Sequence, residues 1–240
     1  MSIALALSLI ASLTYGTSDF FAGLASRRLN VLHATAGTYL VATVAVGVGL
    51  LYVGGTWSAD AAWLGALAGL LAVVGFVAFY AALAIGPMSL LSPAIALLGG
   101  IVPVVVSAVT GQTLGAIQWL AITVAVIATV LISVPSQRSS ERVTVRAAVF
   151  EPPPAAARQG FSSRRAWILA MVAGLLLGVS NSLITIALHE GNLAVVSVLV
   201  SLYPLATVVL AAIVLRERLS ALQVTGIALA IVASVVLALG

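Results

Sequence analysis

Asp19 is the side chain best placed to do chemistry, because it is the only acidic residue well inside a long apolar run. A charge at bilayer depth costs roughly 2.5–3.5 kcal/mol, so such a carboxyl normally faces other helices and has a partner there. One interpretation is a carboxylate that exchanges a proton or binds a cation. The alternatives are structural: a hydrogen bond from Ser18 or a neighbouring helix, or a carboxyl that reaches towards Arg27, about 12 Å further along the helix.

Tyr15 lies one helical turn before Asp19, so the two side chains share a face. Thr14 and Ser18 extend the same polar stripe. This pattern predicts one wall of a solute-binding cavity, with Tyr15 and Asp19 against the solute and Asp19 as the proton-coupling group. The alternative is that the stripe makes hydrogen bonds between helices, which contribute about 0.6 kcal/mol each in membranes.

Three further side chains are candidates for contact with a solute. Asn181 interrupts an apolar run and is costly in lipid unless it is paired, and Tyr80 lies near the equivalent position of the repeat described below. Tyr203 precedes Pro204, whose missing backbone donor can kink a helix and turn a carbonyl towards a cavity. Helix–helix packing and a purely structural kink are the alternatives at these positions.

The composition places the chain in a membrane. It is 62% hydrophobic and 7% charged, with a mean hydropathy of +1.26, whereas soluble domains are about half apolar and a quarter charged. The absence of Cys excludes disulfides and thiolate metal sites. The sequence also lacks HExxH, GxSxG and P-loop motifs, so we predict no enzyme, no metal site and no cofactor.

Eight apolar runs are long enough to cross a bilayer as helices, which takes about 20 residues, and their lack of alternating polarity favours helices over a barrel. They are 3–25, 33–53, 62–85, 90–110, 116–134, 167–188, 194–215 and 221–239. We therefore predict an all-α integral membrane protein. The polar, Arg- and Pro-rich stretch 135–165 is predicted to be a flexible linker between a first part, 1–134, and a second part, 166–240.

Two segments of the chain read as copies of one three-helix unit, residues 62–134 and 167–239. A shift of about 105 positions aligns them without a gap and superposes Gly69 on Gly174, Gly86 on Gly191, Ser92 on Ser197 and Gln118 on Gln223. By the helix count the copies lie an odd number of crossings apart, which turns the second one upside down. Inverted repeats are a recurring architecture of secondary transporters, with the site at the repeat interface.

All ten basic residues are Arg, and the helix count places every one of them on the same membrane face. The positive-inside rule makes this face cytoplasmic, so we predict that the linker lies inside and both termini lie outside. The same distribution accounts for the net charge of +4 without a nucleic-acid partner.

Three stretches of the chain carry a family resemblance. Residues 15–28 read Tyr-Gly-Thr-Ser-Asp-Phe-Phe-Ala-Gly-Leu-Ala-Ser-Arg-Arg. Residues 201–204 read Ser-Leu-Tyr-Pro, and residues 216–220 read Arg-Glu-Arg-Leu-Ser. The first stretch resembles the opening helix of the EamA-like family of the drug/metabolite transporter superfamily. The second and third together resemble the penultimate helix of that family and its Gly-Glu-Arg-Leu-type ending.

The resemblance implies two inverted halves of five helices each. This chain departs from that plan, because its second part resembles only the last three helices of a half, which predicts a 5+3 layout. Arg216 stands where the family commonly has Gly, and Gln112 stands where Glu would be expected. Relatives often have cytoplasmic termini, which is opposite to the orientation that the Arg residues predict here.

These observations predict a secondary transporter of the plasma membrane, driven by an ion gradient or facilitative, that exports a small metabolite or drug. Its partners would be the solute and the lipid bilayer. Two alternatives remain open. The missing helices could leave a cleft that a second copy or a membrane partner completes, which would make the protein a non-transporting assembly subunit. The chain could also be an inactive, truncated transporter.

Overall fold

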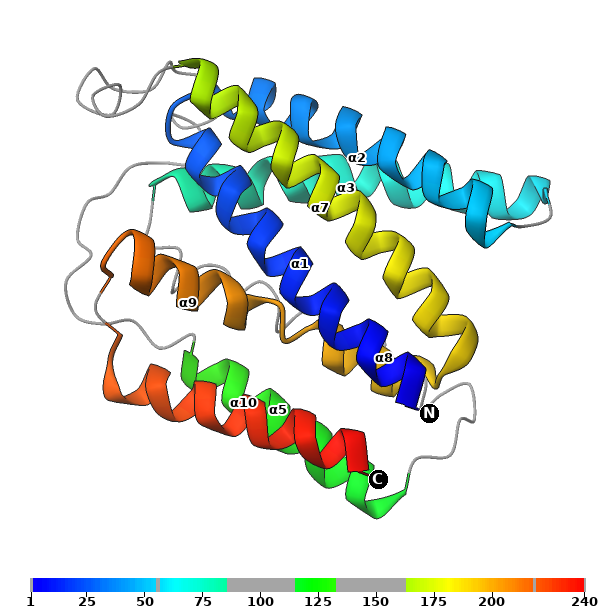
Figure 1. The fold of residues 1–240 in the computed structure, drawn as a ribbon, viewed down its shortest axis with the longest axis vertical. Helices are drawn as coiled ribbons and strands as arrows, with labels where there is room; N and C mark the ends of the chain where they lie inside the picture. Colours follow the sequence, from blue (N-terminus) through cyan, green and yellow to red (C-terminus); the bar gives the residue numbers. More distant parts are fainter. Residues whose placement is uncertain (1, 55–56, 86–114, 133–162, 218, 240) are drawn as a thin grey trace.

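The computed structural model of the chain is all-α (Figure 1). It describes residues 2–54, 57–85, 115–132, 163–217 and 219–239. Within this part of the chain, five helices are long and apolar enough to cross a membrane, which agrees with the predicted class of protein. The predicted span 90–110 and most of the predicted linker lie outside the described residues.

The helices follow most of the predicted spans. They are α1 (Ser2–Ser26), α2 (Val31–Val53), α3 (Ala59–Ile85), α5 (Ala116–Ile132), α7 (Ser163–Glu190), α8 (Leu193–Val200), α9 (Pro204–Val214) and α10 (Ala221–Leu239). α7 begins at Ser163 and so includes the last residues of the predicted linker. A turn at 201–203 divides the predicted span 194–215, because Pro204 has no N–H and begins a new helix, α9.

Most of the helix packing joins the first part of the chain to the second. α7 packs along both α1 and α2, and α1 also contacts α3, α8 and α9. α5 and α10 pack against each other at the side of the bundle away from α2 (Figure 1). The two parts are therefore interleaved and do not form separate bundles.

Buried hydroxyl groups fasten these helices together through the backbone. Each hydroxyl donates to a backbone carbonyl of a helix from the other part of the chain. The four bonds run from Ser18 to Ala173 (2.7 Å), from Thr38 to Ala170 (3.2 Å), from Ser180 to Ala11 (2.5 Å) and from Thr207 to Gly16 (2.8 Å). Such interhelical bonds add to van der Waals packing, which is the main attraction between helices in lipid.

Gln223 joins the start of α10 to the end of α5 and is buried. Its Oε1 accepts the Ser220 backbone N–H at 2.9 Å, and its own N–H donates to the Ser220 hydroxyl at 3.2 Å, which forms a capping box. The Nε2 group donates to the Ile132 C=O of α5 at 3.3 Å. Because this carbonyl lies in the last turn of α5, it has no partner within its own helix.

The Arg residues of the described helices gather at one end of the bundle. Both marked chain ends lie at the opposite end (Figure 1). Arg27 and Arg28 follow α1, Arg164 and Arg165 lie in the first turn of α7, and Arg216 follows α9. The order of the predicted spans likewise placed these Arg residues on one face of the membrane.

Arg216 adopts a left-handed backbone conformation just after the C-cap of α9, with φ of 56°. The N–H of the next residue, Glu217, donates to the Ala211 C=O at 3.3 Å and holds this turn. The left-handed region costs residues other than Gly about 1–2 kcal/mol, and Gly is the usual residue at this point of a helix end.

We expect Arg216→Gly to raise the midpoint of thermal unfolding by about 2–4 °C, because relief of this strain contributes about 1 kcal/mol. Arg216→Ala is the matched control, since it removes the same charge and keeps the strained Cβ. Tryptophan fluorescence of the protein in mild detergent measures both midpoints. Equal midpoints for the two variants would show that the backbone conformation is not the cause.

Candidate functional site

The carboxyl group of Asp19 is buried inside the helix bundle. Its exposed fraction is 0%, and neither carboxyl oxygen has a hydrogen-bond partner within the described part of the chain. Asp19 belongs to the buried face of α1, which runs through Ser8, Ser12, Asp19 and Ser26 at helical spacing. The Ser18 hydroxyl does not stabilise the carboxyl, because it donates to the Ala173 C=O of α7.

Four of the five tyrosines of the chain gather around Asp19. The side chains of Tyr15, Tyr39, Tyr80 and Tyr203 all lie within electrostatic range of its carboxyl group. α1 provides Tyr15 and Asp19, α2 provides Tyr39, α3 provides Tyr80, and the turn before α9 provides Tyr203. We call these five residues the tyrosine–aspartate cluster; both parts of the chain build it.

Aromatic contacts hold the tyrosine rings in place. The rings of Tyr15 and Tyr203 lie 5.0 Å apart, centre to centre. Phe76 of α3 lies between the other two, at 5.1 Å from the ring of Tyr39 and 6.2 Å from that of Tyr80. The hydroxyl groups of Tyr39 and Tyr80 are buried and have no hydrogen-bond partner within the described residues.

Gly16 lets the turn before α9 approach α1 closely. A Cβ at this position would collide with the carbonyl oxygen of Tyr203 and would lie 2.9 Å from the Cβ of Ala206. The two backbones therefore touch beside the Tyr15–Tyr203 ring pair. The hydrogen bond from the Thr207 hydroxyl to the Gly16 C=O secures this contact at 2.8 Å.

The structure brings together four of the five site residues that the sequence predicts, namely Tyr15, Asp19, Tyr80 and Tyr203. Asn181 lies apart from them. It is exposed on α7, and its amide donates to the Leu177 C=O of the same helix at 2.8 Å. The residue beside it, Ser180, turns inward and bonds to α1 instead.

Tyr39 is the cluster residue that was not predicted from the sequence. A signal was present, because Thr35, Thr38 and Tyr39 lie three and four positions apart in the span 33–53 and so share a helix face. Thr35 and Thr38 are buried in the structure. A polar stripe on the second helix therefore marked the face that turns towards α1 and α7.

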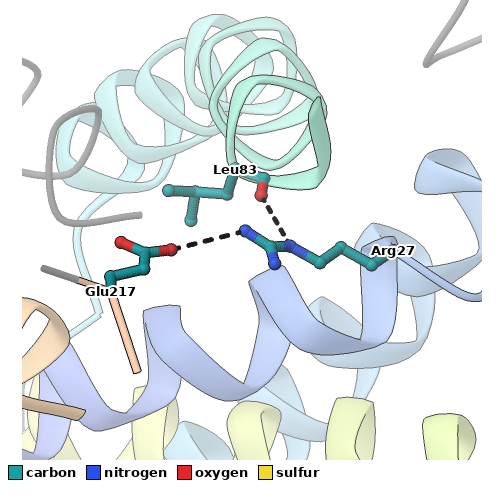
Figure 2. Close-up of polar contacts among 3 residues, drawn as sticks. All are labelled: Arg27, Leu83 and Glu217. Carbon is teal, nitrogen blue, oxygen red and sulfur yellow. Dashed lines mark hydrogen bonds and ion pairs between the residues drawn. The ribbon is translucent and has the colours of Figure 1, made fainter. Parts of the chain in front are cut away.

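Arg27 joins three segments near the Arg-bearing end of the bundle (Figure 2). Its Nε donates to the Leu83 C=O at 3.4 Å, and its Nη2 lies 3.9 Å from Oε1 of Glu217. The Leu83 carbonyl belongs to the last turn of α3, where a cation also interacts favourably with the helix dipole. Burial lowers the pKa of Arg27, and the carboxylate of Glu217 opposes this shift.

A comparison with protein families matches this chain over most of its length. The model described as the EamA-like transporter family matches residues 2–134 and 143–239. The second stretch is shorter than the first and begins inside the segment predicted to be a linker. No curated protein and no solved structure gives a match. Because the two stretches leave only a few residues unmatched, the chain belongs to the EamA-like transporter family.

Proposed function

We propose that this protein is a secondary transporter of a small organic solute, with the tyrosine–aspartate cluster as its solute and proton site. The observation that carries the proposal is the buried carboxyl of Asp19, which has no hydrogen-bond partner among the described residues and is surrounded by four tyrosines. An ionisable residue that faces the interior of a membrane bundle marks a solute or ion route. Membership of a transporter family supports the same reading.

Transport would proceed by alternating access, in which the interleaved parts of the chain rock around the cluster. Asp19 would give up a proton when solute binds on one side and take one up when solute leaves on the other. The contact of Arg27 with Glu217 and with the end of α3 lies on the Arg-bearing side. It would have to break for the cluster to open in that direction.

The orientation follows from the same Arg residues. The Arg-bearing end of the bundle would face the cytoplasm, and both chain ends would lie outside. An inward flow of protons would then drive solute outward, which makes the protein an exporter of the plasma membrane.

The test is solute flux through the purified protein in proteoliposomes with an imposed pH gradient. We expect at least one member of a panel of amines, amino acids, sugars and nucleobases to cross the membrane and to move protons in the opposite direction, which a dye trapped inside the vesicles reports. Protein-free vesicles control for leakage. Folded protein that moves no member of the panel would count against a transporter and favour an assembly subunit.

A further inference from the structure

The cluster holds an unusual amount of unused hydrogen-bonding capacity. Both carboxyl oxygens of Asp19 and the hydroxyls of Tyr39 and Tyr80 are buried without partners in the described residues, and they come from three different helices. Buried polar groups are nearly always hydrogen-bonded, and an unsatisfied one costs the full desolvation penalty. Unsatisfied groups from three helices that converge on one place indicate a ligand that bonds to all of them.

The small hydroxyl groups next to the cluster cannot meet this need, because each is already bonded to a backbone carbonyl. Ser18 donates to α7, Thr38 also donates to α7, and Thr207 donates to α1. If these bonds moved to Asp19, the contacts between helices would be lost.

The charge of the cluster decides which ligands it favours. Its ionisable members are one carboxyl and four phenols, and no basic side chain contributes to the electrostatics of these groups in the described chain. The Arg nearest in sequence, Arg27, lies about 12 Å along the helix and contacts Leu83 and Glu217. In its ionised form this carboxyl attracts cations and repels anions, and a bound cation stabilises that form.

The aromatic rings point to the same kind of ligand. The face of a tyrosine ring attracts cations within about 6 Å, and more strongly where water is excluded. Tyr15 and Tyr203 form one aromatic wall of the cluster, and Tyr39, Phe76 and Tyr80 form another. Both walls also suit an apolar body attached to the charged group.

We infer that the cluster binds a small organic cation that carries N–H donors, that is, a primary or secondary ammonium group. The three N–H groups of a primary ammonium match three groups, the carboxyl of Asp19 and the hydroxyls of Tyr39 and Tyr80, whereas a secondary ammonium donates to two of them. The tyrosine rings enclose the charge. A quaternary ammonium ion has the same charge and no N–H, so it leaves these four atoms unsatisfied. The inference rests on the proposed function, because it assigns the solute class of the same site.

Binding of three matched compounds to the full-length protein in neutral detergent tests this selectivity. They are 2-phenylethylamine, its N,N,N-trimethyl analogue and 3-phenylpropanoate, measured by isothermal titration calorimetry near neutral pH. We expect the amine to bind at least about tenfold more tightly than the trimethyl compound, because charge-assisted hydrogen bonds are lost, and the carboxylate to bind not at all. Equal affinity for the first two compounds, or tighter binding of the carboxylate, overturns the inference.

Removal of single hydroxyl groups locates the binding. Tyr39→Phe and Tyr80→Phe keep the rings, and each should weaken binding of the amine about fivefold or more while leaving the trimethyl compound unaffected. Tyr52→Phe is the matched control, because Tyr52 is the fifth tyrosine and its side chain is 87% exposed. Thermal unfolding of each variant shows whether it is folded. Wild-type affinity in both folded cluster variants rules out the proposed role of these hydroxyls.

The inference and the proposed function can fail separately. Selective binding of the amine without flux of any solute in proteoliposomes refutes transport and supports the assigned ligand class. Gradient-driven flux of a neutral or anionic solute, by protein that does not bind the amine, supports transport and refutes the ligand class.

Discussion

Asp19→Asn is expected to abolish the accumulation of solute that a pH gradient drives. Asn has nearly the same size as Asp and does not exchange a proton, so solute can no longer be linked to proton movement. A one-for-one exchange of a monovalent cation with a proton supports a solute concentration ratio across the membrane of about tenfold per pH unit. The variant should show no such concentration difference. Solute inside and outside proteoliposomes is measured at a fixed gradient of one or two pH units.

The surroundings of Asp19 support this assignment. The titratable groups that face it are Tyr15 on its own helix, Tyr39 from α2, Tyr80 from α3 and Tyr203 before α9. A carboxyl group is a much stronger acid than a phenol, so Asp19 is the cluster member suited to exchange protons.

Asp60→Asn is the matched control for this experiment. Asp60 is an exposed acidic residue in the first turn of α3 and lies outside the cluster, so its variant should accumulate solute like the wild type. The measurement is informative only if Asp19→Asn is folded, which its elution in detergent and its unfolding midpoint show. Wild-type accumulation by folded Asp19→Asn would exclude Asp19 as the coupling group.

Gly174→Ala should destabilise the protein by about 1–3 kcal/mol, because it forces a methyl group into a filled space between α2 and α7. A Cβ at Gly174 would clash with the carbonyl oxygen of Thr38 and would lie 2.8 Å from the Cβ of Val41. The clash falls on the backbone of α2, which cannot give way as a flexible side chain can. It would also strain the hydrogen bond from Thr38 to Ala170.

Gly69→Ala is the control for this second prediction. The shift that superposes the two repeat copies places Gly69 on Gly174, but a Cβ at Gly69 meets no heavy atom of the described residues within 4 Å. Ala favours the helical backbone over Gly by about 1 kcal/mol, so this variant should keep or slightly raise the unfolding midpoint. Thermal unfolding of both variants in detergent, followed by tryptophan fluorescence, gives the comparison. Equal shifts in the two variants would show that the contact of α7 with α2 does not limit stability.

Gly69 and Gly174 show that equivalent positions of a sequence repeat can have different neighbours in the folded protein. Both residues occupy the same position in similar apolar helices, and nothing local distinguishes them. The approach of α2 to α7 leaves no room for a Cβ at Gly174, and the chain positions involved are more than a hundred residues apart.

The properties that the sequence alone determined are those that arise from the length and polarity of single segments. Long apolar runs define most of the helices because the bilayer requires about 20 such residues for each crossing. The Arg residues group at one end of the bundle because their positions follow the order of those runs. The burial of Asp19 was predictable in the same way. A charge exposed to lipid is costly whichever helix lies beside it, so the carboxyl had to face the inside of the bundle.

The properties that only the tertiary structure decided concern which faces meet. Asn181 and Ser180 are adjacent in the sequence, yet a rotation of about 100° per residue turns Ser180 towards α1 and leaves Asn181 exposed. Tyr39 joins the cluster because α2 lies against α3 and α1, and Tyr203 reaches it because Gly16 allows two backbones to touch. Such contacts depend on complementary surfaces of helices distant in the chain, and the polarity of a single segment does not specify them.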